Sequence, residues 1–333
     1  MKTFMGAVES LGRVYLSYIR RAERVNQLPT RVWIEPTAAC NFSCGHCPHG
    51  TGADIPKGLM KMELFTRIID ELAGSLNDVN LFHRGESLIH PRLADMVEYC
   101  SARGLHTRLH TNAGLLTEER AMALIEAGLS YISFSVDGYS RDVYNKNRIG
   151  GDFDETVANI RRLLELKKEK GRGPFTIVQV MEIGEDEPGK EERREDFVKN
   201  FAGLGLDRFV VRTPHNWAGD FEQFGHGLNG RSARFTPCTF LWYSMTIMFD
   251  GLVAACPQDF FRKIEVGSVA DKSVAEVWNN EVLRGLRRRM GQRNVAGLSP
   301  CDQCDMLTRK TFMGAPVNYL STFLRDNLLV RQR

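Results

Sequence analysis

The chain has 333 residues, of which 43% are hydrophobic and 26% charged, and its formal net charge is +3. This composition is typical of a globular protein with a sizeable core, and the length suits a catalytic domain of about 200 residues with a smaller appendage. The net charge is too small to indicate a nucleic-acid partner. The sequence has no apolar run of about 18 residues and no recognisable secretory signal, so we expect a cytoplasmic protein without membrane association.

The first segment, residues 1–30, contains an amphipathic basic pattern over residues 1–27. Apolar and aromatic side chains recur on one side, with Arg13, Arg20, Arg21 and Arg24 among the other positions. This periodicity predicts a helix that packs on the body of the protein, with attachment to a membrane surface as the alternative.

Residues 31 to about 213 alternate β-rich runs with helical patterns. Asp152 and Thr117 are expected N-caps, and Gly104 and Gly128 stand where helices should end. Six strand–helix units in series predict a parallel sheet that curls into a partial (β/α)6 TIM-like barrel, whose chemistry lies at the carboxyl ends of the strands. The predicted strands are 31–36, 79–84, 106–111, 131–136, 175–181 and 209–213, and the predicted helices are 61–76, 91–103, 117–127 and 153–170.

After residue 214 the alternation ends, and we place a domain boundary near residue 220. A hairpin is predicted over 243–249 and 252–255, turning at Asp250-Gly251, and one helix over 273–290. The predicted units are therefore a barrel over 31–220, a smaller domain over 221–315 and a tail over 316–333. We interpret the basic cluster near the predicted helix as a solvated face, with an anion-binding role as the alternative: Arg284, Arg287, Arg288, Arg289 and Arg293.

Seven of the eight cysteines fall into two groups, which indicates metal sites and not disulfides in a cytosolic chain. The first group, Cys40, Cys44 and Cys47, follows the first predicted strand. A closed zinc site needs four ligands. A [4Fe–4S] cluster takes one ligand per iron, so three cysteines would leave one iron open for catalysis.

This CxxxCxxC pattern resembles the signature of the radical S-adenosylmethionine (SAM) superfamily. The resemblance implies that the first cluster binds SAM and that SAM is also contacted from the ends of the second, third and fourth strands and the next loop. Arg84-Gly85-Glu86 resembles the family's GGE motif for the SAM amino group, with Arg84 in place of the first glycine. The implied contacts are His46 beside the adenine, Gly85, Glu86, Thr111, Asn112, Ser135, Asp137, and Arg148 near the SAM carboxylate.

The second cysteine group resembles the opening of the SPASM domain of such enzymes. It comprises Cys238, Cys256, Cys301 and Cys304, and no cysteine follows. The resemblance therefore implies a truncated, twitch-like C-terminal domain with one auxiliary [4Fe–4S] cluster, all of whose irons have thiolate ligands. A structural zinc site is the alternative for these four residues.

The family's chemistry implies a reduced first cluster that cleaves SAM to a 5′-deoxyadenosyl radical, with flavodoxin or ferredoxin as the low-potential donor. An auxiliary cluster without an open iron suits electron acceptance, so we predict the net oxidation of a small polar alcohol such as a sugar or aminocyclitol. Arg212, His215 and Glu182 are the candidates for the substrate base.

Three alternatives remain open at this point. A maturase acting on a peptide or protein and a redox-neutral epimerase or lyase would use the same radical. A non-enzymatic iron–sulfur or zinc protein would leave the SAM-like strand ends unexplained, and cleavage of SAM distinguishes it from an enzyme.

Overall fold

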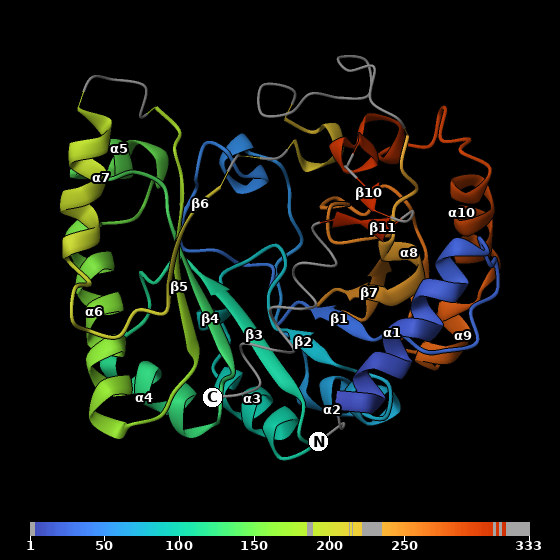
Figure 1. Ribbon diagram of the computed structural model, residues 1–333, viewed down its shortest axis with the longest axis horizontal. Helices are drawn as coiled ribbons and strands as arrows, with labels where there is room; N and C mark the ends of the chain where they lie inside the picture. The colour runs from blue at the N-terminus through green and yellow to red at the C-terminus, as the bar shows by residue number, and fades with distance from the viewer. Residues whose placement is uncertain are drawn as a thin grey trace.

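The computed structural model describes residues 4–184, 189–212, 214, 216–221, 235–308, 311–312 and 315–317 (Figure 1). Within them, the main sheet has the strand order β6-β5-β4-β3-β2-β1-β7-β8-β9. The first six strands are parallel, which confirms the predicted partial (β/α)6 barrel. They are β1 (Arg31–Ile34), β2 (Asp78–Asn80), β3 (His106–Thr111), β4 (Tyr131–Val136), β5 (Phe175–Met181) and β6 (Arg208–Arg212).

Helices follow the strands and cover the apolar face of this sheet. Alternate strand residues such as Val79, Leu109 and Ile132 are fully buried in the main core, as the two-residue period of a strand requires. The helix α6 has the predicted bounds because Asp152 accepts a hydrogen bond from the Glu155 N–H and Gly171 ends it in the left-handed conformation. The helices are α2 (Met62–Leu72), α3 (Leu93–Ser101), α4 (Glu118–Glu126), α5 (Arg141–Asn147), α6 (Phe153–Lys170) and α7 (Lys190–Lys199).

The C-terminal part continues the same sheet. The strand β7 (Ser244–Ile247) runs parallel to β1, and β8 (Leu252–Ala254) and β9 (Gly267–Ser268) extend the sheet antiparallel. The predicted hairpin is thus present, with Gly251 at a φ of 88°. Hydrogen bonding crosses the expected boundary near residue 220, and the division into domains stays a prediction. Shorter elements are η1 (Pro48–Thr51), η2 (Ser87–Ile89), η3 (Trp217–Gly219), η6 (Cys301–Gln303), η7 (Asp305–Thr308) and the pair β10 (Thr311–Phe312) and β11 (Ala315–Pro316).

The N-terminal helix α1 (Phe4–Ile19) lies against the C-terminal part of the chain (Figure 1). Tyr18 donates a hydrogen bond to the Pro237 carbonyl at 2.9 Å and meets Trp242 edge-on in the helix α8 (Phe240–Tyr243). The Trp242 indole donates to the Ala22 carbonyl. The helix therefore packs on the body of the protein, beside Cys238. Across the part of the chain that the structure describes, no helix is both long and apolar enough to span a membrane.

The single helix predicted over 273–290 is wrong. Two helices are present, α9 (Val274–Trp278) and α10 (Glu281–Gly291). The Asn279 side chain donates to and accepts from the backbone of Val25, and the Asn280 side chain accepts from the Leu283 N–H as the N-cap of α10. Side chains that compete for backbone groups in this way interrupt a helix.

The interpretation of the basic cluster as a solvated face is also wrong at Arg287. This guanidinium is fully buried and donates to the carbonyls of Leu241, Trp278 and Glu23. Burial lowers its pKa to about 10. Arg287 thus joins α8, α9, α10 and the segment after α1.

Candidate active site

The loop that carries the first three cysteines is fixed on both sides. The Glu86 N–H donates to the Ala39 carbonyl at 2.9 Å, and the Ser43 N–H donates to the Ile149 carbonyl at 2.8 Å. A Cβ on Gly85 would lie 2.3 Å from the Ala39 carbonyl oxygen, so only glycine allows this contact. The loop lies at the carboxyl ends of the strands, where the barrel places its chemistry.

The thiols of Cys40, Cys44 and Cys47 fit a cluster. Burial raises the pKa of Cys40 to about 11 and that of Cys47 to about 12. The nearby Cys44 raises the pKa of both thiols further, because two thiolates would repel each other. In this environment the thiols need a bound cation in order to ionise to thiolates. No three His, Cys, Asp or Glu side chains of the described chain converge as one metal ion requires. In a cluster each thiolate bonds a different iron, so three cysteines suit a site with one open iron.

The second group behaves in the same way. Cys301 feels the charges of Cys256, Cys238 and Cys304, which places the four thiols near one another. Burial raises the pKa of Cys256 to about 12. These four side chains would hold the auxiliary cluster, and a structural zinc site stays the alternative.

Glu86 braces the ends of two neighbouring strands. Its buried carboxylate accepts from the Thr111 hydroxyl at 2.9 Å, the Asn112 N–H at 2.8 Å and the Leu88 N–H at 3.0 Å. The Asn112 amide donates in turn to the Asn41 side chain in the cysteine loop. Burial raises the pKa of Glu86 although these donors oppose the shift. The structure brings together the residues expected to face SAM, and their roles toward SAM stay predictions.

His46, Asp137 and Arg148 form a buried charged group next to Cys44. Asp137 Oδ2 lies 2.9 Å from His46 Nε2 and 2.5 Å from Arg148 Nε. Arg148 Nη1 donates toward Cys44 Sγ at 3.8 Å. Burial opposes ionisation of Asp137, but the Arg148 charge lowers its pKa below the usual value. A SAM carboxylate that approaches Arg148 would share the guanidinium with Asp137.

The candidates for the substrate base are less well supported. The Glu182 carboxylate accepts from the Tyr139 hydroxyl at 2.6 Å and from Lys190, and the Tyr139 hydrogen bond lowers its pKa. A carboxylate stabilised in this way is a weak proton acceptor. Arg212 ends β6 in register with Met181, and His215 lies outside the described residues. The predicted Ser135 accepts from the Gln179 amide at 3.1 Å, and we had not predicted Gln179.

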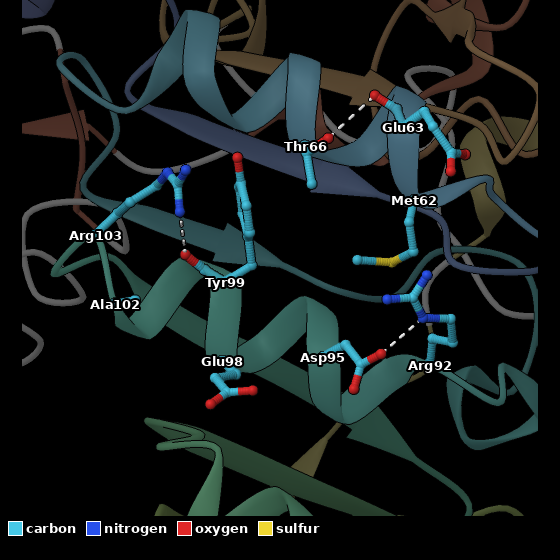
Figure 2. A pocket seen from close by; sticks show the side chains of 9 residues that line it. All are labelled: Met62, Glu63, Thr66, Arg92, Asp95, Glu98, Tyr99, Ala102 and Arg103. Atoms are coloured by element: carbon cyan, nitrogen blue, oxygen red, sulfur yellow. Dashed lines mark hydrogen bonds and ion pairs between the residues drawn. The ribbon is translucent and has the colours of Figure 1, made fainter.

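A groove of 520 Å³ lies elsewhere, between α2 and α3 (Figure 2). Arg92 pairs with Asp95 at one end, and Arg103 lies over the Tyr99 ring at the other. Because Arg92 pairs with Asp95, Arg103 pairs with Asp70 and no cysteine lines the groove, we do not assign the chemistry to it. Its lining is Met62, Glu63, Thr66, Arg92, Asp95, Glu98, Tyr99, Ala102 and Arg103.

A buried polar group connects the segments of the two cysteine groups, and it was not predicted from the sequence. Glu35, just beyond β1, is fully buried and pairs with Arg84 at 2.7 and 2.8 Å. His83 and His49 flank this pair. The arginine in place of a glycine at position 84 was the one sequence signal, and its partner 49 residues away could not be identified from spacing.

The partial barrel and the two groups of thiols define an iron–sulfur enzyme, and comparison with known proteins agrees. The radical SAM superfamily matches residues 34–189, and the SPASM iron–sulfur cluster-binding domain matches residues 238–305. The chain belongs to the radical SAM superfamily. It is accordingly an enzyme that binds SAM and [4Fe–4S] clusters.

Two relatives come from Methanosarcina barkeri (strain Fusaro). The chain is 32% identical over 150 residues to its AdoMet-dependent heme synthase, a match that spans 45% of this chain but only 42% of that relative's length. It is 32% identical over 319 residues to the Fe-coproporphyrin III synthase, which covers 78% of this chain and 77% of the relative. The crystal structure of BtrN in complex with AdoMet and 2-DOIA superposes with a TM-score of 0.56 at 16% identity, over 84% of this chain and 94% of BtrN. That likeness supports the fold.

Proposed function

We propose that the enzyme cleaves SAM reductively, removes a hydrogen atom from a polar substrate and oxidises that substrate overall. The observation that carries the proposal is the unequal ligand number of the two cysteine groups, three beside β1 and four in the C-terminal part. Three thiolates leave an iron open for SAM, whereas four leave none, so the second group suits electron acceptance. When bound, the clusters and SAM supply the electrons and the radical.

The chain's own residues would orient SAM and exclude water. Gly85 keeps its strand end in contact with the cysteine loop. The Glu86 carboxylate holds that strand end next to Asn112 at the end of β3. The buried Arg148 offers a cation for the SAM carboxylate, and Asp137 holds that guanidinium in place. Fixed charges in a water-excluded site are the protein's main contribution to such chemistry.

The leading substrate class remains a small polar alcohol such as a sugar or aminocyclitol. The relation to Fe-coproporphyrin III synthase over 78% of the chain favours a second candidate, a precursor of an iron porphyrin. Peptide maturation and redox-neutral outcomes are further alternatives. We propose a low-potential flavodoxin or ferredoxin as the electron donor and a cytoplasmic setting for the reaction.

The test is iron content and SAM cleavage in anaerobically reconstituted protein. We expect about eight irons in the wild type and about four in the Cys40/Cys44/Cys47→Ala variant, on the basis of two four-iron clusters. Only the wild type should form 5′-deoxyadenosine with dithionite and SAM. Faster 5′-deoxyadenosine formation with an aminocyclitol would support the small-alcohol class. Faster formation with an iron-porphyrin precursor would support the second candidate. Protein with about four irons, all lost in the variant, would remove the electron-acceptor argument.

A further inference from the structure

Glu35 is a buried hub at the carboxyl end of β1. Its carboxylate accepts from the Arg84 guanidinium at 2.7 and 2.8 Å, from the Arg84 N–H at 3.3 Å and from the Phe249 N–H at 3.3 Å. It thus joins the end of β1, the segment after β2 and the turn of the C-terminal hairpin. Although burial opposes ionisation, Arg84 lowers the pKa of Glu35 to about 2, so the pair is ionic at neutral pH.

Two histidines connect this pair to the two cysteine loops. His49 Nε2 lies 3.0 Å from the Arg84 carbonyl, and His49 is two residues from Cys47. His83 Nε2 lies 3.2 Å from the Pro257 carbonyl, next to Cys256. Because carbonyl oxygens only accept, both rings donate through Nε2. His83 Nδ1 then faces Glu35 Oε2 at 3.5 Å.

The segment after Cys256 also contacts both histidines. Phe260, four residues after Cys256, is 1% exposed and contacts both His49 and His83, with ring centroids 6.1 and 6.3 Å away. A hydrogen-bonded and aromatic bridge therefore connects the segment after Cys47 to the segment around Cys256.

We propose that Glu35, Arg84 and His83 form a tuning link between the two cluster loops, in which the charge balance of the Glu35–Arg84 pair sets the reduction potential of the auxiliary cluster. The inference rests on the proposed function, because it assumes that the second cysteine group holds a redox-active cluster. The step concerned is the uptake of one electron by that cluster, with no bond made or broken. A negative charge nearby disfavours the reduced form, and a positive charge favours it.

The chain offers a matched control in the other ion pair between the same strands. Arg31 and Asp78 are also bidentate, at 2.6 and 2.8 Å, but at the amino ends of β1 and β2. Four strand residues place this pair about 13 Å farther along the barrel than Glu35. Both pairs should contribute to stability, whereas only the Glu35–Arg84 pair should act on the auxiliary cluster.

The experiment measures the auxiliary cluster alone, in the full chain with Cys40, Cys44 and Cys47 replaced by alanine. EPR-monitored redox titration at pH 8 gives its midpoint potential. We expect Glu35→Gln to raise the ratio of reduced to oxidised cluster about tenfold at a fixed potential, which is about 59 mV for one electron. Arg84→Gln should shift it in the opposite direction, Arg84→Lys should stay near the parent value, and Asp78→Asn should leave it unchanged.

The outcomes separate the two claims. A parent protein without a redox-active iron cluster overturns the proposed function and this inference with it. A four-iron parent whose potential is unmoved by Glu35→Gln, or moved equally by Asp78→Asn, overturns the inference alone and leaves the pair a structural brace. If Glu35→Gln fails to assemble the cluster, the Arg84→Gln variant decides. A lower midpoint potential than in the parent supports the inference, and an unchanged or higher potential overturns it.

Discussion

Replacing Arg148 by lysine tests whether its guanidinium holds SAM. In the structure the side chain is almost fully buried, with Nε on Asp137 and Nη1 directed at Cys44. Lysine keeps the positive charge that Asp137 requires, but a single ammonium cannot contact Asp137 and a second anion in the planar geometry of a guanidinium. The variant therefore removes the planar guanidinium and keeps an ion pair with Asp137.

The size of the effect follows from the contact that is lost. One hydrogen bond to a charged group contributes about 1.5–3 kcal/mol, so the dissociation constant of SAM should rise about 10- to 150-fold. The iron content should stay that of the wild type, because no cysteine is changed.

The assay is a SAM titration of reconstituted protein, followed by the change in the EPR signal of the first cluster. The matched control is Arg141→Lys, at the start of the helix α5 that Arg148 caps at its C-terminus. The pair of Arg141 with Asp154 is exposed, and exposed pairs contribute little. An Arg148→Lys protein with full iron content and wild-type affinity for SAM would refute the assignment of Arg148 to the SAM carboxylate.

Three further predictions concern packing and pH. Gly85→Ala should displace the first cysteine loop, because the new Cβ would lie 2.3 Å from the Ala39 carbonyl oxygen. Iron analysis should then show about half of the wild-type iron. The control Gly74→Ala, whose new Cβ has no atom within 4 Å, should retain all of the iron. Arg287→Met should lower the unfolding free energy by about 3 kcal/mol by leaving buried carbonyls without donors, against about 0.5 kcal/mol or less for Arg284→Met on the same helix, which loses a 3.5 Å pair with Glu281; equal thermal midpoints for the two variants would contradict this. The pKa of Glu35 is depressed from 4.5 to about 2 in the folded protein, so its stabilisation, about 3 kcal/mol, is present above pH 4.5 and is lost as the pH falls toward 2; urea unfolding from pH 6 to 3 should show a shallower decline for Glu35→Gln than for the wild type.

The elements that the sequence predicted well are those with local signals. The helix α6 carries its cap, its apolar stripe and its terminating glycine within 20 consecutive residues, and the β7–β8 hairpin carries Asp250-Gly251 at its turn. The break between α9 and α10 occurs at two adjacent asparagines, but the contact that explains it is distant in the sequence. Asn279 interrupts the helix by bonding to Val25, 254 residues away.

The candidate site divides along the same line. The cysteines are recognisable because their spacing within each short segment limits the chemistry they can perform. The Glu35–Arg84–His83 group is formed by contacts over 49 and 174 residues, between segments that only the folded chain brings together. A sequence shows an arginine where its relatives are expected to have glycine, but not the buried carboxylate that makes this arginine tolerable.

The position of Arg287 on α10 is itself a local signal that this arginine is buried. Leu283, Leu286 and Met290 form the buried stripe of α10, and Arg287 lies on that stripe at helical spacing. A charged residue in such a position needs buried acceptors, and here they are carbonyls at the ends of α8 and α9 and beyond α1. These elements surround Pro237, next to Cys238, through Tyr18 and Trp242. Arg287 therefore stabilises the segments that contact Pro237, the residue before Cys238.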